Sequence, residues 1–103
     1  MPIDILLVED NHGDIGLMRD VLGEINPTAR HPVVTDGVEA MQFLGYQGKY
    51  VYAPRPSVIL LDLNLPKIHG HEVLKYIKSN PHLRTIPVIV LSSSEADSDV
   101  ATS

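Results

Sequence analysis

Four short apolar stretches are spaced along the chain, and each ends in polar residues. Residues 3–8, 58–61 and 87–91 are rich in Val, Ile and Leu, whereas residues 30–35 form a weaker stretch with β-branched side chains at 33–35. Continuous apolar runs of this length are typical of strands that are buried on both faces of a parallel sheet. The pattern therefore predicts four strands at these positions.

Helical periodicity separates the predicted strands. Apolar side chains at three- and four-residue spacing run from Ile15 to Ile25, from Val38 to Leu44 and from Val73 to Ile77. Asn26-Pro27, Gly45 and Pro81 follow these three stripes and are typical helix ends. Ser94 with Asp97 resembles a capping box and predicts a fourth helix. The irregular segment 46–57 contains a glycine and two prolines, and it predicts an extended surface loop.

Strands and helices therefore alternate along the whole chain. This order predicts an α/β domain with a doubly wound parallel sheet and right-handed crossovers. Ligands of such a sheet bind outside the carboxyl ends of the strands, so the residues that follow the apolar runs are the candidates for a site.

Carboxylates occupy two of these strand ends. Glu9 and Asp10 follow the first run, and Asp62 follows the third. Neighbouring carboxylates repel one another without a cation, and hard oxygen ligands favour Mg²⁺ or Mn²⁺. An aspartate beside such a metal can act as a nucleophile toward phosphorus and form an acyl phosphate. A single aspartate after a strand is more often a loop or capping residue, so the pattern alone leaves a purely structural role open.

Composition narrows the function classes. The chain has 103 residues, 8 Lys and Arg against 13 Asp and Glu, a net charge of −5, and no cysteine. The acidic balance argues against nucleic-acid binding, which depends on basic side chains. The lack of cysteine excludes a disulfide scaffold and a thiolate zinc site. No apolar run approaches the roughly 20 residues that span a bilayer, and the N-terminus lacks a signal-peptide pattern. We therefore expect a cytoplasmic domain without membrane contact.

Three motifs resemble the receiver domain of two-component response regulators. They are residues 5–11 (ILLVEDN), residues 60–66 (LLDLNLP) with Gly70, and residues 86–92 (IPVIVLS). The resemblance covers residues 1–103 and implies the flavodoxin-like, CheY-like fold with strand order 2-1-3-4. The long segment 46–56 is similar to that of single-domain receivers that partner phytochrome-type histidine kinases.

The resemblance also implies roles for individual residues. Asp62 matches the phosphoacceptor, Asp10 the acid that binds Mg²⁺ directly, and Glu9 the acid that holds it largely through water. Asn64 lies where the family offers a backbone carbonyl to the metal. Ser92 matches the hydroxyl residue that turns toward the phosphoryl group. Mn²⁺ is the alternative cation.

A function follows from this resemblance. A sensor histidine kinase would transfer a phosphoryl group to Asp62, and the phosphorylated domain would signal through protein–protein contact rather than act as an enzyme. The Asn64 side chain, Ser94 and His12 are candidate modulators of partner contact or of acyl-phosphate hydrolysis.

Three alternatives stay open. The chain could be the receiver part of a longer response regulator with an output domain. It could be a metal-dependent phosphohydrolase with an aspartyl nucleophile, although Asn64 stands where that chemistry places a second aspartate as general acid. It could be a scaffold that only binds a partner, although none of Glu9, Asp10 and Asp62 is lost.

One part of the receiver pattern has no counterpart. The family has a fifth strand that ends in a Lys-Pro pair, followed by a fifth helix, whereas Lys78 is the last lysine in this sequence. The fourth strand would then be an exposed apolar edge. The missing fifth strand has three possible explanations: a tail that was removed, a tail that the sequence omits, or pairing of the edge strand in a homodimer. We expect a removed or omitted tail.

Overall fold

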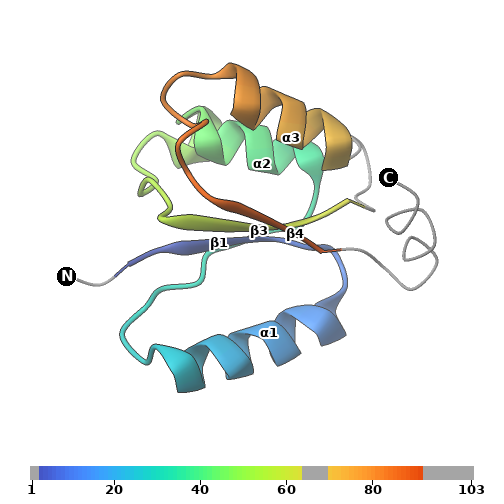
Figure 1. The fold of residues 1–103 in the computed structure, drawn as a ribbon, viewed down its shortest axis with the longest axis vertical. Coiled ribbons are helices and arrows are strands. Elements are labelled where there is room, and N and C mark those ends of the chain that lie inside the picture. Colours follow the sequence, from blue (N-terminus) through green and yellow to red (C-terminus); the bar gives the residue numbers. More distant parts are fainter. Residues whose placement is uncertain (1–2, 64–69, 92–103) are drawn as a thin grey trace.

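The computed structural model describes residues 3–63 and 70–91, which form a parallel sheet flanked by helices (Figure 1). The strands are β1 (Ile5–Val8), β2 (Val33–Val34), β3 (Val58–Asp62) and β4 (Val88–Leu91), and the helices are α1 (His12–Ile25), α2 (Gly37–Leu44), the 3-10 helix η1 (Gly48–Tyr50) and α3 (Gly70–Ser79). The strand order is β2-β1-β3-β4, with every pair parallel. The predicted fold class and strand order are confirmed. The capping box at Ser94 and Asp97 lies outside the described residues.

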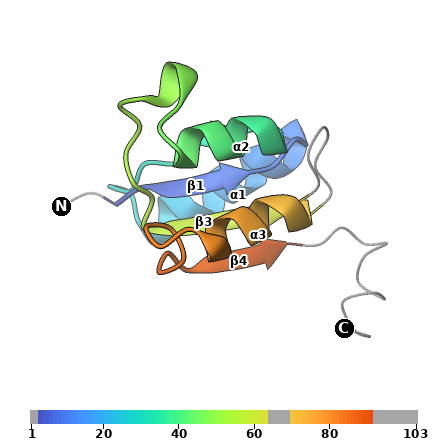
Figure 2. The same ribbon diagram turned by 90° about the horizontal axis from the view of Figure 1, so that it is seen from above.

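The helices divide between the two faces of the sheet. Helix α1 covers one face, and α2 and α3 lie together on the other (Figures 1 and 2). Side chains of β1 alternate between these layers: Leu6 and Val8 belong to the apolar cluster under α2 and α3, and Ile5 and Leu7 to the cluster under α1. All four are buried. This two-sided burial explains why β1 reads as a continuous apolar run.

Strand β4 departs from that expectation. It is an edge strand of the described sheet, and Ile89 and Val90 are 52% and 42% exposed. The predicted strand is confirmed, and so is the expectation that it forms an exposed apolar edge of the sheet that the structure describes. The general rule that an apolar run is buried on both faces holds for β1 but not for β4, because burial depends on what covers each face.

Side-chain caps determine where two helices begin. The Asn11 side chain accepts a hydrogen bond from the Asp14 N–H at 3.0 Å, and Asp36 accepts one from the Glu39 N–H at 2.8 Å. These bonds satisfy backbone donors that the first helical turn leaves without partners. The cap at Asn11 places the start of α1 directly after the end of β1.

The segment before β3 is less extended than the sequence predicts. It contains η1, and the Tyr50 hydroxyl donates a hydrogen bond to the Glu39 carboxylate of α2. The Tyr50 ring packs on Phe43 with 5.2 Å between ring centroids. The Tyr50 hydrogen bond lowers the pKa of Glu39, while burial and the same carboxylate raise the pKa of Tyr50 to about 12. One aromatic residue therefore fastens this segment to α2.

Candidate functional site

The three predicted carboxylates converge at the carboxyl ends of β1 and β3. Val8 is in register with Leu61, so the next residues, Glu9 and Asp62, are neighbours across the two strands. One carboxylate oxygen from each of Glu9, Asp10 and Asp62 lies within 4.8 Å of the others. The prediction that neighbouring strand ends bring these acids together is confirmed.

The carboxylates differ in exposure. Glu9 and Asp62 are only 4% and 8% exposed, whereas Asp10 is exposed. The backbone of Glu9 is held by its N–H, which donates to the Val34 carbonyl at 3.0 Å. The Asn11 N–H donates to Glu9 Oε1 at 3.1 Å. Two buried acids therefore form the inner wall of the site, and one acid faces solvent.

Asn11 has a double role that the sequence reading did not assign. Its backbone N–H binds the Glu9 carboxylate, and its side chain caps α1. The N-terminus of a helix carries partial positive charge, which favours anions close to it. The signal was present in the sequence, since an asparagine directly before an amphipathic stripe is typical of an N-cap.

Burial makes Glu9 an unusual acid. Burial raises the pKa of Glu9 most, the Asn11 N–H lowers it, and the hydrogen bond and charge of Asp62 raise it, so that the pKa is about 7. Within residues 3–63 and 70–91, no lysine or arginine forms an ion pair with Glu9. The raised pKa therefore favours the protonated form of Glu9 below about pH 7 in the metal-free protein.

A divalent cation fits this donor set. Carboxylate oxygens are the ligands that Mg²⁺ and Mn²⁺ prefer, and a dication beside three acids would offset the repulsion between them, which adds to the effect of burial on the pKa of Glu9. The exposed Asp10 leaves one side of the site open to solvent. Mg²⁺ usually keeps several waters, which a site open on one side permits.

Gly70 is required by the backbone of the site. A β-carbon at this position would lie 2.4 Å from Leu63 Cα and 2.7 Å from the Asp62 carbonyl oxygen. The Gly70 N–H donates to the Leu63 carbonyl at 3.2 Å. Helix α3 therefore begins against the peptide that follows Asp62, and only glycine permits this approach.

The pKa of Glu9 predicts the pH dependence of stability for the metal-free protein. The folded chain keeps a proton on Glu9 up to about pH 7, whereas the unfolded chain loses it near 4.5. The folded state binds more protons between these values, so the free energy of unfolding falls as pH rises through this range. The loss corresponds to about 3 kcal/mol at most. Urea denaturation in EDTA at pH 5 and pH 7.5 measures it.

Glutamine at position 9 separates this effect from other titrations. In Glu9→Gln the stability should change less between the two pH values than in the wild type, because the group that titrates is gone. Glu24→Gln makes the same change at an exposed position of α1 and should keep the wild-type pH dependence. A Glu9→Gln protein with an unaltered pH dependence would contradict the assignment.

The other residues predicted to belong to the site are not part of the carboxylate cluster, and most of them lie outside the residues that the structure describes. His12 is the first residue of α1 and is exposed. It does not belong to the carboxylate cluster, and its suggested role as a modulator stays a prediction. Asn64, Ser92 and Ser94 lie outside the described residues. Among helices of the described ranges, none is long and apolar enough to cross a membrane.

Residues 5–103 match the response regulator receiver domain family. The chain is 49% identical over 102 residues to response regulator Rcp1 of Synechocystis sp., with 99% of this chain and 69% of that protein aligned. It is 42% identical over 100 residues to the probable methanogenesis regulatory protein FilR2 of Methanothrix harundinacea, with 96% of this chain and 63% of that protein aligned. Both relatives are thus longer than the chain.

Solved structures agree with these sequence matches. The phosphorylated cyanobacterial phytochrome response regulator RcpA has a TM-score of 0.90 and 48% identity, covering 98% of this chain and 72% of that one. The Mn²⁺-bound form of Rcp1 has a TM-score of 0.89 and 49% identity, covering 97% and 72%. Fold, acidic cluster and relatives lead to one conclusion: the chain belongs to the response regulator receiver family, the phosphoacceptors of two-component signalling.

Proposed function

We propose that Asp62 accepts a phosphoryl group from a phosphohistidine of a sensor kinase. The observation that carries the proposal is the convergence of Glu9, Asp10 and Asp62 within 4.8 Å in a receiver chain. A carboxylate oxygen of Asp62 attacks phosphorus and forms an acyl phosphate. The P–N bond breaks, and its electron pair returns to the imidazole ring of the kinase. The cluster thus combines a nucleophile with two further acids.

The neighbouring residues prepare Asp62 for this step. Glu9 and Asp10 would hold Mg²⁺ together with Asp62, and the backbone carbonyl of Asn64 would complete the protein ligands. When bound, Mg²⁺ neutralises charge on the transferring phosphoryl group, where catalysis depends mainly on positioning and electrostatics. Gly70 lets α3 pack against the peptide that follows Asp62, and this packing would limit the movement of Asp62.

Residues around the cluster would convert phosphorylation into a signal. The Ser92 hydroxyl would donate to a phosphoryl oxygen and so couple the modified site to the surface that meets a partner. His12, Ser94 and the Asn64 side chain would set the rate at which water reaches the acyl phosphate. The resulting output is a protein–protein contact that depends on phosphorylation.

The kinase in this proposal is of the phytochrome type. Support comes from RcpA, which is described as a cyanobacterial phytochrome response regulator and is 48% identical to this chain. Because such kinases draw their phosphoryl group from ATP, the proposal places the domain in the cytoplasm.

Beryllofluoride, which imitates a phosphoryl group on aspartate, tests the proposal without a kinase. We expect beryllofluoride with Mg²⁺ to shift the ¹⁵N–¹H signals of Glu9, Asp10 and Asp62 and of the first turn of α1. EDTA should reverse the shifts. Asp10→Asn should weaken the response to Mg²⁺, whereas Asp20→Asn on the exposed side of α1 should not. No response to beryllofluoride with Mg²⁺ would favour a scaffold that only binds a partner.

A further inference from the structure

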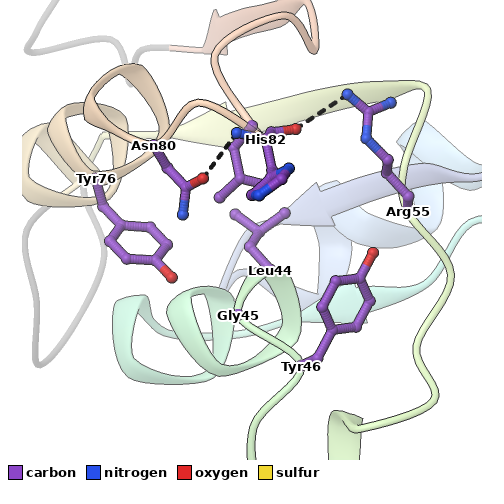
Figure 3. Close-up of a pocket in the computed structure, with 8 residues that line it drawn as sticks. Leu44, Gly45, Tyr46, Arg55, Tyr76, Asn80 and His82 are labelled. Carbon is purple, nitrogen blue, oxygen red and sulfur yellow. Dashed lines mark hydrogen bonds between the residues drawn. The ribbon is translucent and has the colours of Figure 1, made fainter.

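A cavity lies beside the C-terminal ends of α2 and α3 (Figure 3). It has a volume of about 440 Å³ and is lined by the end of α2, by the segment before β3 and by the end of α3 with the turn that follows. Helices of such a fold run against the strand direction, so their C-terminal ends meet at the amino ends of the strands. The volume lies within the range of small-molecule sites.

Tyr46 and Tyr76 flank this cavity, and the backbone at positions 45 and 46 allows their placement. A β-carbon at Gly45 would lie 2.9 Å from the Tyr76 hydroxyl, so glycine leaves room for that phenol. Gly45 was predicted as a helix end, but its φ of −94° is one that any residue can adopt. The need for glycine at this position therefore comes from the lack of room for a β-carbon and not from a left-handed backbone. Tyr46 has a φ of 56°, a left-handed conformation that few non-glycine residues adopt. Figure 3 shows the two phenols on either side of Leu44.

Arg55 provides the positive charge of the cavity. Its Nη2 donates to the His82 carbonyl at 3.1 Å and to Thr85 Oγ1 at 3.0 Å, which holds the guanidinium in place. An arginine has five N–H donors in a rigid fork, so three of them stay available for a ligand. No carboxylate is among the lining residues. The charge of the cavity therefore favours an anion in an otherwise acidic protein.

The other lining groups add donors and an apolar floor. Asn80 Oδ1 accepts from the His82 N–H at 2.9 Å, which leaves the Asn80 amide group as a donor. Within the described ranges, neither the Tyr46 nor the Tyr76 hydroxyl has a hydrogen-bond partner. Leu44 is buried and contributes apolar surface between the phenols.

We propose that this cavity binds a small aromatic carboxylate. The carboxylate would meet the free N–H groups of Arg55, and the ring would lie between Tyr46 and Tyr76 over Leu44. A single guanidinium matches a singly charged carboxylate in charge and in bidentate geometry. Aromatic side chains favour offset or edge-to-face contact with a ring, which accounts for the aromatic part of the ligand.

Indole-3-acetate is the probe, and two related compounds distinguish the contribution of its carboxylate from that of its aromatic ring. We expect saturable ¹⁵N–¹H shifts at Gly45, Tyr46 and His82 with indole-3-acetate. The neutral indole-3-acetamide keeps the ring, and butyrate keeps the carboxylate; both should bind at least tenfold more weakly. Absence of saturable shifts, or equal binding of acid and amide, would overturn the proposal.

Variants test whether the cavity itself is responsible. Arg55→Gln should weaken indole-3-acetate binding at least tenfold, because it removes the charge that faces the carboxylate. Arg84→Gln removes an exposed cation that does not line the cavity, and its affinity should stay within twofold. Because Arg55 also tethers two segments, Tyr46→Ala is the second variant and should weaken binding at least fivefold. Wild-type affinity in both Arg55→Gln and Tyr46→Ala would exclude this site.

Discussion

Replacing Asp62 with asparagine is expected to abolish phosphorylation of the protein by acetyl phosphate with Mg²⁺ or by a phosphorylated histidine kinase. Asparagine has the size of aspartate, but its neutral amide is a poor nucleophile and cannot give the acyl phosphate. The substitution also removes one charge from a cluster whose oxygens lie within 4.8 Å of one another, so a folded variant is expected. Intact-mass measurement after incubation detects the gain of one phosphoryl group in the wild type and its absence in the variant.

Asp20→Asn is the matched control for this experiment. Asp20 is exposed on α1 and lies outside the clustered acids, so the same chemical change there should leave phosphorylation within about twofold of the wild type. A stable phosphoryl group on Asp62→Asn would place the acceptor elsewhere, and Asp10 would be the next residue to replace. Loss of phosphorylation in both variants would show that the charge of the protein, not Asp62, limits the reaction.

Much of this site follows from the sequence, because strand ends are predictable. Apolar runs predicted β1 and β3, and parallel pairing places their carboxyl ends at one edge of the sheet. The meeting of Glu9 with Asp62 therefore needs only the register of two strands. The helix ends are equally local, since Asn11 and Asp36 cap their own helices.

Features that depend on three-dimensional packing were not predictable in the same way. The pKa of Glu9 depends on burial and on Asp62, which is distant in sequence. The attachment of Tyr50 to Glu39 replaced an expected extended loop with η1. The cavity between Tyr46 and Tyr76 joins segments whose own sequences contain no binding motif. Each of these features depends on a residue that lies on a different helix, strand or loop.

Alanine at position 70 is expected to destabilise the protein by about 2 kcal/mol or more, a cost in the range that forced overpacking produces. The new methyl group would lie 2.4 Å from Leu63 Cα, so α3 or the Asp62–Leu63 peptide must move. Gly16→Ala is the matched control in α1, because a β-carbon there has no neighbour within 4 Å. It should stabilise the protein by about 0.5–1 kcal/mol, since alanine favours helix more than glycine does. Urea denaturation of both variants measures the two opposite signs.

The same substitution should also affect phosphorylation, because the peptide that meets Gly70 follows the proposed acceptor. Displacement of that peptide moves Asp62 relative to Glu9, so Gly70→Ala should accept phosphoryl groups from acetyl phosphate more slowly than Gly16→Ala even where both are fully folded. Circular dichroism at the assay temperature confirms folding in each case. Equal phosphorylation rates would show that the close approach of α3 serves stability alone, and equal signs of the stability change would contradict the steric argument itself.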